Sequence, residues 1–174
     1  MAIRQVVTYP ARVLKSLTEP VGEVDERARE IATDLVDTMY DSPGCVGLAA
    51  PQLGVARRAF ALDVSVMKKP PEGNHGLVVL FDPELVMTSG SEIKREGCMS
   101  VPEYTCDIRR ATGVVVRGTT PEGHTQVIEA EGFEARAFQH ELDHLDGMLV
   151  LDRVASSSDV FARKRYAKKG QHLK

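Results

Sequence analysis

Hydrophobic residues recur at helical spacing in two stretches of the chain. In the first, between about Asp25 and Tyr40, apolar residues fall on one side and charged residues mostly on the other. The apolar stripe consists of Ala28, Ile31, Leu35 and Met39. This pattern predicts an amphipathic helix. Asp25 is a suitable N-cap, and the turn-forming residues 41–44 predict where the helix ends.

The second helical stretch lies nearer the C-terminus and is apolar on two sides. One stripe comprises Phe133, Ala137, His140, His144 and Met148, and the other comprises Phe138, Leu142, Leu145 and Leu149. A helix with two apolar sides is expected in the interior of the protein, and Gly147 is expected to end it. Histidines and a glutamate are costly in an interior unless something compensates them.

Short apolar runs bounded by turn residues predict a set of strands between and after these points. The predicted strands are 58–65, 77–81, 85–88, 104–109, 113–117 and 125–130. Residues 82–83, an Asp-Pro pair, are expected to end the second strand. Residues 118–123 are expected to form a hairpin loop. We further predict an extended arm over 1–20, a loop over 67–76 and a third, basic helix over about 159–169.

Bulk properties predict one soluble domain that spans residues 1–174. The hydrophobic fraction is 43%, the charged fraction is 27% and the net charge is −3, which gives no reason to expect a DNA or membrane partner. No apolar run approaches the roughly 20 residues of a membrane-spanning helix. The first residues, Met1–Gln5, have neither the apolar core of a signal peptide nor a transit-peptide pattern, so we expect a cytoplasmic location.

The candidate functional residues are three cysteines and one motif that contains two histidines. Cys45, Cys98 and Cys106 are too few, and odd in number, for a disulfide framework, which favours thiols or metal ligands. The sequence HELDH at residues 140–144 is an instance of HExxH. On a helix its two histidines share one face, so they can hold one metal ion. Glu141 lies beside them as a candidate base.

The position of the third metal ligand distinguishes between several classes of HExxH protein. Catalytic zinc-type sites keep three protein ligands. In metzincin-type peptidases a third histidine would fall at position 150, which is Val150. Other HExxH peptidases use a downstream glutamate, and residues 145–174 contain none. Asp146, Asp152, Asp159 and His172 remain, at no familiar spacing. Upstream, Cys98 would complete a set of one thiolate and two imidazoles that suits zinc or ferrous iron.

Taken together, three segments resemble the bacterial peptide deformylases. They are Val46–Gln52 (VGLAAPQ), Glu96–Ser100 (EGCMS) and Gln139–His144 (QHELDH), in the family's order and at similar separations. The resemblance covers nearly the whole chain. It implies an α+β fold with mixed or antiparallel sheets packed around a central helix that bears the HExxH motif, together with an N-terminal and a C-terminal helix. The chain departs from the family pattern at Cys45, where glycine is usual, and at Arg136, where relatives often have an apolar pocket residue.

The resemblance also implies an activity and a set of residue roles. The activity is removal of the formyl group from the initiator methionine of nascent chains. Cys98, His140 and His144 would hold a divalent metal, most naturally ferrous iron, with zinc, nickel or cobalt as substitutes. The catalytic groups would be Glu141 as base, with Gln52 and the backbone N–H of Met99 as oxyanion donors. Substrate-binding residues would be Val46, Gly47, Gly97, Phe133, Ala137 and His140.

Two features beyond the motifs carry further expectations. Asp143 lies inside HELDH and cannot share the ligand face, and the resemblance implies an arginine at the position of Arg110. We therefore predict that the two residues pair and support the metal helix. The basic tail could contact the ribosome, although a solvated face is the simpler interpretation. We expect a monomer. The competing functions are a metallopeptidase, which the missing downstream ligand disfavours, and a structural metal module, which needs four ligands and no base.

Overall fold

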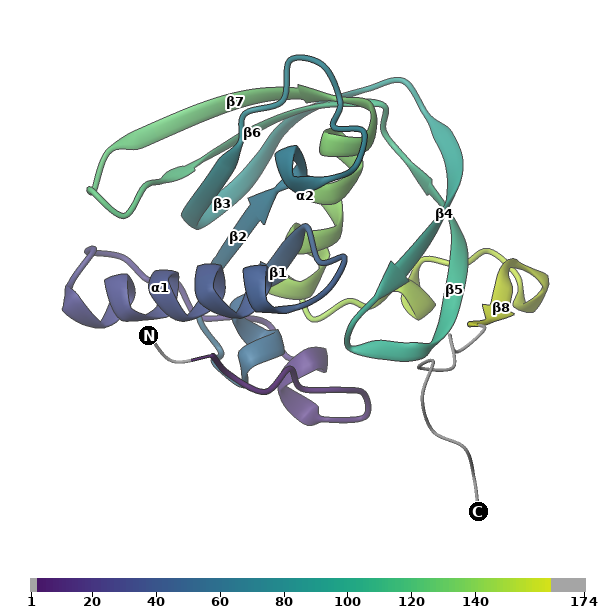
Figure 1. Ribbon diagram of the computed structural model, residues 1–174, viewed down its shortest axis with the longest axis horizontal. Coiled ribbons are helices and arrows are strands. Elements are labelled where there is room, and N and C mark those ends of the chain that lie inside the picture. Colours follow the sequence, from purple (N-terminus) through teal and green to yellow (C-terminus); the bar gives the residue numbers. More distant parts are fainter. Residues whose placement is uncertain (1–2, 164–174) are drawn as a thin grey trace.

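The computed structural model describes residues 3–163 (Figure 1) and has an α+β architecture. Within that range it contains the α-helices α1 (Glu26–Asp41) and α2 (Gly132–Leu145). The strands are β1 (Gly47–Ala49), β2 (Ala59–Asp63), β3 (Leu77–Ser89), β4 (Glu92–Cys98), β5 (Val101–Arg110), β6 (Gly113–Thr119), β7 (Thr125–Glu131) and β8 (Val160–Ala162). The described part has no helix that is both long and apolar enough to cross a lipid bilayer.

The strands form two antiparallel sheets. One has five strands in the order β1-β2-β3-β6-β7, and the other has three in the order β4-β5-β8. All strand pairs within these sheets are antiparallel. The predicted α+β class with antiparallel sheets is therefore confirmed.

Strand β2 lies inside the larger sheet and is buried on both faces. Successive side chains of a strand point to opposite faces, so β2 contributes to two cores. Phe60 and Leu62 pack in the cluster that includes Phe138 of α2, and the rings of Phe60 and Phe138 meet edge to face at 5.8 Å. Ala59 and Ala61 pack in the cluster of α1. The two helices thus cover opposite faces of this sheet.

Helix α1 begins and packs as its sequence pattern predicts. The Asp25 carboxylate accepts a hydrogen bond from the backbone N–H of Ala28 at 2.8 Å, which satisfies one of the free donors at the helix start. The predicted stripe of Ala28, Ile31, Leu35 and Met39 is buried.

Helix α2 lies between the five-stranded sheet and the β4–β5 hairpin (Figure 1). Most of its side chains are buried, including charged ones. The chain leaves the helix through Gly147, which has a φ of 70°. A Cβ there would lie 2.9 Å from the carbonyl carbon of Lys15, so the N-terminal arm packs directly against this turn. Glycine is needed for both reasons.

Two expectations about the elements were wrong, and the strands β1, β4 and β8 were not predicted. Residues 82–83 do not end a strand, because β3 continues through a bulge between Phe81 and Glu84, where proline is tolerated. Strand β4 was not predicted, because its exposed, charged residues alternate with few apolar ones. The C-terminal helix expected from Asp159 is replaced by a short 3-10 turn (Ser157–Asp159) and β8. Residues 164–169 of that prediction lie outside the described range.

Candidate active site

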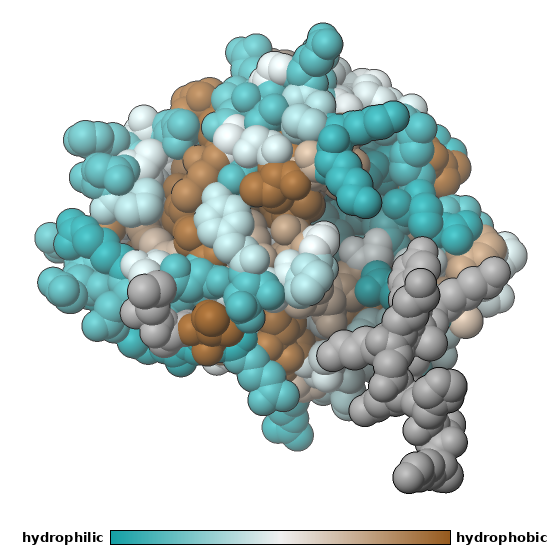
Figure 2. All heavy atoms as spheres, viewed as in Figure 1, coloured by the Kyte–Doolittle hydropathy of each residue, from teal (hydrophilic) through white to brown (hydrophobic). Residues whose placement is uncertain are grey.

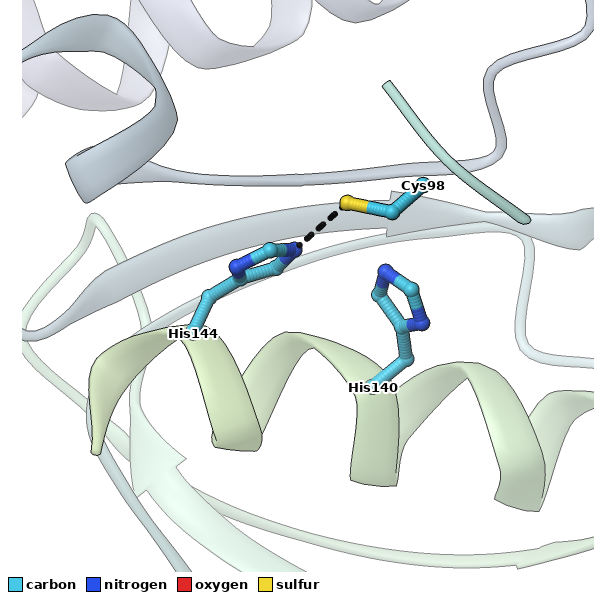
Figure 3. Close-up of side chains that lie close together, drawn as sticks. All are labelled: Cys98, His140 and His144. Atoms are coloured by element: carbon cyan, nitrogen blue, oxygen red, sulfur yellow. Dashed lines mark hydrogen bonds between the residues drawn. The ribbon is translucent and has the colours of Figure 1, made fainter. Parts of the chain in front are cut away.

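One sulfur and two imidazoles converge where β4 meets α2. Cys98 is the last residue of β4, and the two-residue turn Met99–Ser100 follows it because Cys98 pairs with Val101 across the hairpin. His140 and His144 lie one turn apart on α2 and point toward the sulfur (Figure 3). The ligand atoms of these three residues lie within 4.8 Å of one another, and the Cys98 Sγ to His144 Nε2 distance is 3.3 Å.

The surroundings of Cys98 and His140 suit metal binding. Burial alone would raise the pKa of the Cys98 thiol, but the two neighbouring imidazoles outweigh it and hold this pKa well below its ordinary value. His140 Nδ1 lies 3.1 Å from a Glu96 carboxylate oxygen, so this nitrogen carries the proton and Nε2 is left as a ligand atom. The ring nitrogen Nδ1 of His144 is buried with no partner among the described residues.

These residues fit a divalent transition metal. A thiolate with two imidazoles is a common donor set for zinc and ferrous iron, and three ligands leave a coordination position open for catalysis. The two imidazole rings stand at 73° to each other with centroids 5.0 Å apart. An ion between them would also stabilise the buried thiolate, which is costly to leave unpaired.

Glu141 lies next to the cluster, on the same helix as the two histidines. Its oxygen Oε2 is buried without a hydrogen-bond partner among residues 3–163. Burial raises the pKa of Glu141 to about 7, against the opposing effect of the two imidazoles. Its other oxygen, Oε1, lies over Gly47, and a Cβ on Gly47 would overlap it. Gly47 therefore has to be glycine to admit the carboxylate.

The Gln52 amide is fixed beside Cys98. It belongs to the 3-10 turn Ala50–Leu53 and is 2% exposed. Its oxygen accepts from the Ala49 N–H at 2.9 Å, and its Nε2 donates to Ser100 Oγ at 3.2 Å and lies 3.8 Å from Cys98 Sγ. Both ends of the amide therefore have hydrogen-bond partners, and the turn that carries it directly follows the edge strand β1.

A cavity of about 170 Å³ opens beside the cluster. Its lining includes every residue predicted to bind substrate, namely Val46, Gly47, Gly97, Phe133, Ala137 and His140. Gln52, Met99, Cys98 and Glu141 also line it, whereas His144 lies behind. The face of the molecule in Figure 2 carries many hydrophilic side chains, with apolar patches between them.

Two strand edges border this cavity. β1 is the terminal strand of the larger sheet and β4 that of the smaller one, and Gly47 and Gly97 line the cavity from these two strands. The N–H of Asp63 donates to the carbonyl of Val46 at 2.8 Å. Because backbone groups alternate in direction along a strand, the N–H and C=O of Gly47 point away from β2, toward the free edge.

The departure at Cys45 places a thiol at the cavity. Cys45 Sγ donates to the Gly47 carbonyl at 3.1 Å. Burial, with a smaller effect of Glu141, raises the pKa of this thiol to about 12. The group therefore stays protonated and acts as a weak donor rather than as a nucleophile.

The predicted pair of Arg110 and Asp143 is present. Arg110 Nη1 donates to Asp143 Oδ2 at 2.6 Å, and both side chains are buried. Sequence reasoning missed that Glu96 is the centre of this cluster, since it gave Glu96 no role. It also missed Arg153, which donates to Asp143 at 2.6 and 3.0 Å. Asp143 thus joins α2 both to β5 and to the chain after it.

Comparison with known proteins agrees with this geometry. The polypeptide deformylase family matches residues 3–160. The chain belongs to the peptide deformylase family. A curated peptide deformylase from Thermodesulfovibrio yellowstonii is 38% identical over 97% of this chain and 99% of its own length. Members of this family are enzymes that remove N-formyl groups from nascent peptides, and the family implies dependence on a metal.

Solved deformylase structures share the fold. One from Ehrlichia chaffeensis in complex with actinonin has a TM-score of 0.83 and 32% identity, and covers 91% of this chain and 92% of that one. Another, from Acinetobacter baumannii and bound to Met-Ala-Ser, has a TM-score of 0.80 and 30% identity, and covers 88% of this chain and 99% of that one. At 30% and 32% sequence identity, these structures support membership of the same family as well as a shared fold.

Proposed function

We propose that this chain is a single catalytic domain that hydrolyses the formyl group from N-formylmethionyl peptides and releases formate and a free methionyl N-terminus. One observation carries this proposal. Cys98, His140 and His144 converge beside an unpartnered, buried Glu141 oxygen at the wall of a small cavity. The Met-Ala-Ser bound to the Acinetobacter relative has the sequence that such a reaction would leave.

In this proposal Cys98, His140 and His144 hold one divalent ion. When bound, such an ion supplies Lewis acidity to a carbonyl oxygen and lowers the pKa of water toward about 7. Ferrous iron is the proposed native ion, with zinc, nickel or cobalt able to replace it. The donor set of one thiolate and two imidazoles supports this choice.

Glu141 moves the proton. Its Oε2 accepts a proton from the attacking water, and a pKa near 7 lets it do so at neutral pH. The same oxygen then returns the proton to the departing amine nitrogen. Because position 47 is glycine, the carboxylate can lie against β1 at the wall of the cavity.

Two donors hold the developing negative charge on the formyl oxygen. They are the Nε2 of Gln52 and the backbone N–H of Met99. Gln52 is held in place by Ala49 and Ser100, so it needs no rearrangement when charge develops. A donor of this kind is worth about 3–4 kcal/mol of activation free energy.

The substrate peptide lies between the two strand edges. The outward-facing backbone of Gly47 on β1, and Gly97 on β4, pair with it as a strand, which demands no particular side chain from the peptide. Val46, Phe133, Ala137 and the His140 ring enclose the methionine side chain. Phe133 is 42% exposed, so substrate would cover apolar surface that is open in the free protein.

The reaction is tested with formyl-Met-Ala-Ser. We expect formate and intact Met-Ala-Ser, identified by mass spectrometry. Acetyl-Met-Ala-Ser should react far more slowly, because its extra methyl group must fit against the short segments Cys45–Gln52 and Glu96–Ser100. A norleucine side chain should replace methionine well. Cleavage of an internal bond with the formyl group retained would instead identify a peptidase.

The ligand set is tested by metal content. Cys98→Ala should lose the bound metal, and the matched control Cys106→Ala should keep it. Cys106 is also buried, but it is not part of the converging group of Cys98, His140 and His144. Retention by the first variant and loss by the second would show that the other cysteine is the ligand.

The cellular location, the oligomeric state and the partners of this chain are part of the proposal too. We expect a cytoplasmic monomer that acts on newly synthesised chains and binds neither DNA nor membranes. Contact with the ribosome would depend on the basic residues within 163–169. Of these, all but Arg163 lie outside the described range. Co-sedimentation of the full chain with ribosomes, compared with a chain that ends after Arg163, tests this contact.

A further inference from the structure

Arg136 is a buried charge that the proposed reaction does not use. It lies on α2 one turn before His140 and is 4% exposed. Its Nη1 donates to Glu96 Oε1 at 2.7 Å and to the Ile108 carbonyl at 3.2 Å, and its Nη2 lies 3.4 Å from the carbonyl and 3.6 Å from the carboxylate of the half-buried Glu92. Its Nε has no partner among the described residues. The guanidinium is therefore held against Glu96 in a place where an apolar side chain could fill the volume.

The guanidinium of Arg110 already binds both carboxylate oxygens of Glu96 without Arg136. Arg110 binds it in bidentate fashion, with Nε to Oε1 and Nη2 to Oε2 both at 3.0 Å. This fork fixes the orientation of the carboxylate. The same Oε2 accepts the hydrogen bond from His140 Nδ1 at 3.1 Å. Arg136 therefore adds a second positive charge to a carboxylate that one arginine has already positioned.

We propose that Arg136 is a positioning residue that acts through Glu96 to weaken His140 as a metal donor. A carboxylate that accepts from the other ring nitrogen of a metal-bound histidine makes that histidine a stronger donor. A second guanidinium on the carboxylate draws charge away from this hydrogen bond. The inference rests on the proposed metal centre, but it does not depend on the formyl substrate.

The buried setting gives this effect its size. Arg136, Arg110 and Glu96 are all less than 8% exposed, so water screens their charges little. The positive charge of Arg136 also opposes a nearby cation directly, and both effects have the same sign. Arg136 thus lowers the affinity of the site for the metal. It also leaves the bound ion more electron-poor, which makes the ion a stronger Lewis acid.

The experiment compares Arg136→Met with Arg136→Lys. Cobalt(II) affinity is measured by competition with a chelator, and the visible absorption of the cobalt protein reports the donor strength of the ligands. Arg136→Met should bind cobalt about tenfold more tightly, at the lower end of changes caused by altering partners of metal ligands, and its absorption bands should shift. Arg136→Lys, which keeps the charge, should stay near the wild type.

Arg153→Met is the matched control. It removes a guanidinium from the same cluster, but Arg153 contacts Asp143 and is 43% exposed, so its effect should stay below about threefold because solvent screens it. Unchanged or weaker cobalt binding by Arg136→Met would overturn the proposal, as would equal shifts for the Met and Lys variants. If Arg136→Met does not fold, Arg136→Gln serves as the neutral variant. Formate release by the wild type tests the proposed reaction separately.

Discussion

The carboxylate of Glu141 lies near His140, His144 and Cys98 and lines the cavity. One of its oxygens has no partner within residues 3–163. Glu141→Gln keeps the shape of the side chain but removes the proton acceptor. We expect a fall in kcat of about a hundred- to ten-thousand-fold, the usual contribution of a general base. Steady-state formate release with metal content measured in parallel checks this. A variant within about threefold of the wild type at full metal content would remove Glu141 from the mechanism.

The two histidines and the glutamate of HExxH could be named from sequence because helical spacing fixes which side chains share a face. Cys98 was named from the chemistry of the donor set and from the resemblance of its segment to the family. Glu96 shows the limit of that reasoning. It stands next to Gly97 in a recognised motif, yet its four interactions come from Arg110, Arg136 and His140, which are 14 to 44 residues away. Such a cluster has no local signature in a single sequence, since only the packing of β4 against α2 creates it.

At the scale of elements, the approach of β1 to α2 sets the position of the base. Because a Cβ at Gly47 would overlap Glu141 Oε1, Gly47→Ala should displace the carboxylate and lower kcat by more than tenfold, as misplacement of catalytic groups by about 1 Å does. In the background of Glu141→Gln, the same change should cost much less, because both substitutions act on one group. Additive losses in the double variant would show that Gly47 acts independently of Glu141.

The link between β5 and α2 is predicted to support stability. Arg110 is buried against Glu96 and Asp143, so Arg110→Ala removes the bidentate partner of Glu96 and one of the two arginines that bind Asp143. Breaking a buried pair in this way costs about 3–5 kcal/mol. Denaturant unfolding measures the free energy. The neighbouring Arg109→Ala is the control, because Arg109 is exposed and its guanidinium donates only to Ser91 among residues 3–163. Its loss should change the free energy of unfolding by less than about 0.5 kcal/mol.

The element pattern was predictable where burial and periodicity agree. Both helices and the strands β2, β3, β6 and β7 have apolar residues at the spacing that their packing requires. β4 and β8 escaped prediction because most of their side chains are exposed and leave no such pattern. β1 escaped because it is only three residues long. β3 escaped in its length, because its bulge carries the Asp-Pro pair within a continuous strand.

At the scale of the whole molecule, the choice of metal determines how the enzyme behaves in air. If ferrous iron is native, activity should decay in the presence of oxygen and persist when nickel or cobalt replaces iron, because both iron and the thiolate can oxidise. Half-lives of formate release measured with and without oxygen check this. Equal half-lives for the iron protein would favour zinc as the native ion.

The two strand edges beside the cavity have a consequence for timing. Unpaired edges normally invite other sheets to add to them, but here β1 and β4 border one small cavity. Under the proposed function, a single extended segment can enter between them, whereas an N-terminus already paired in a sheet or wound in a helix has no free backbone to offer. The geometry therefore sets an order of events, in which deformylation comes before the N-terminus of the client protein folds.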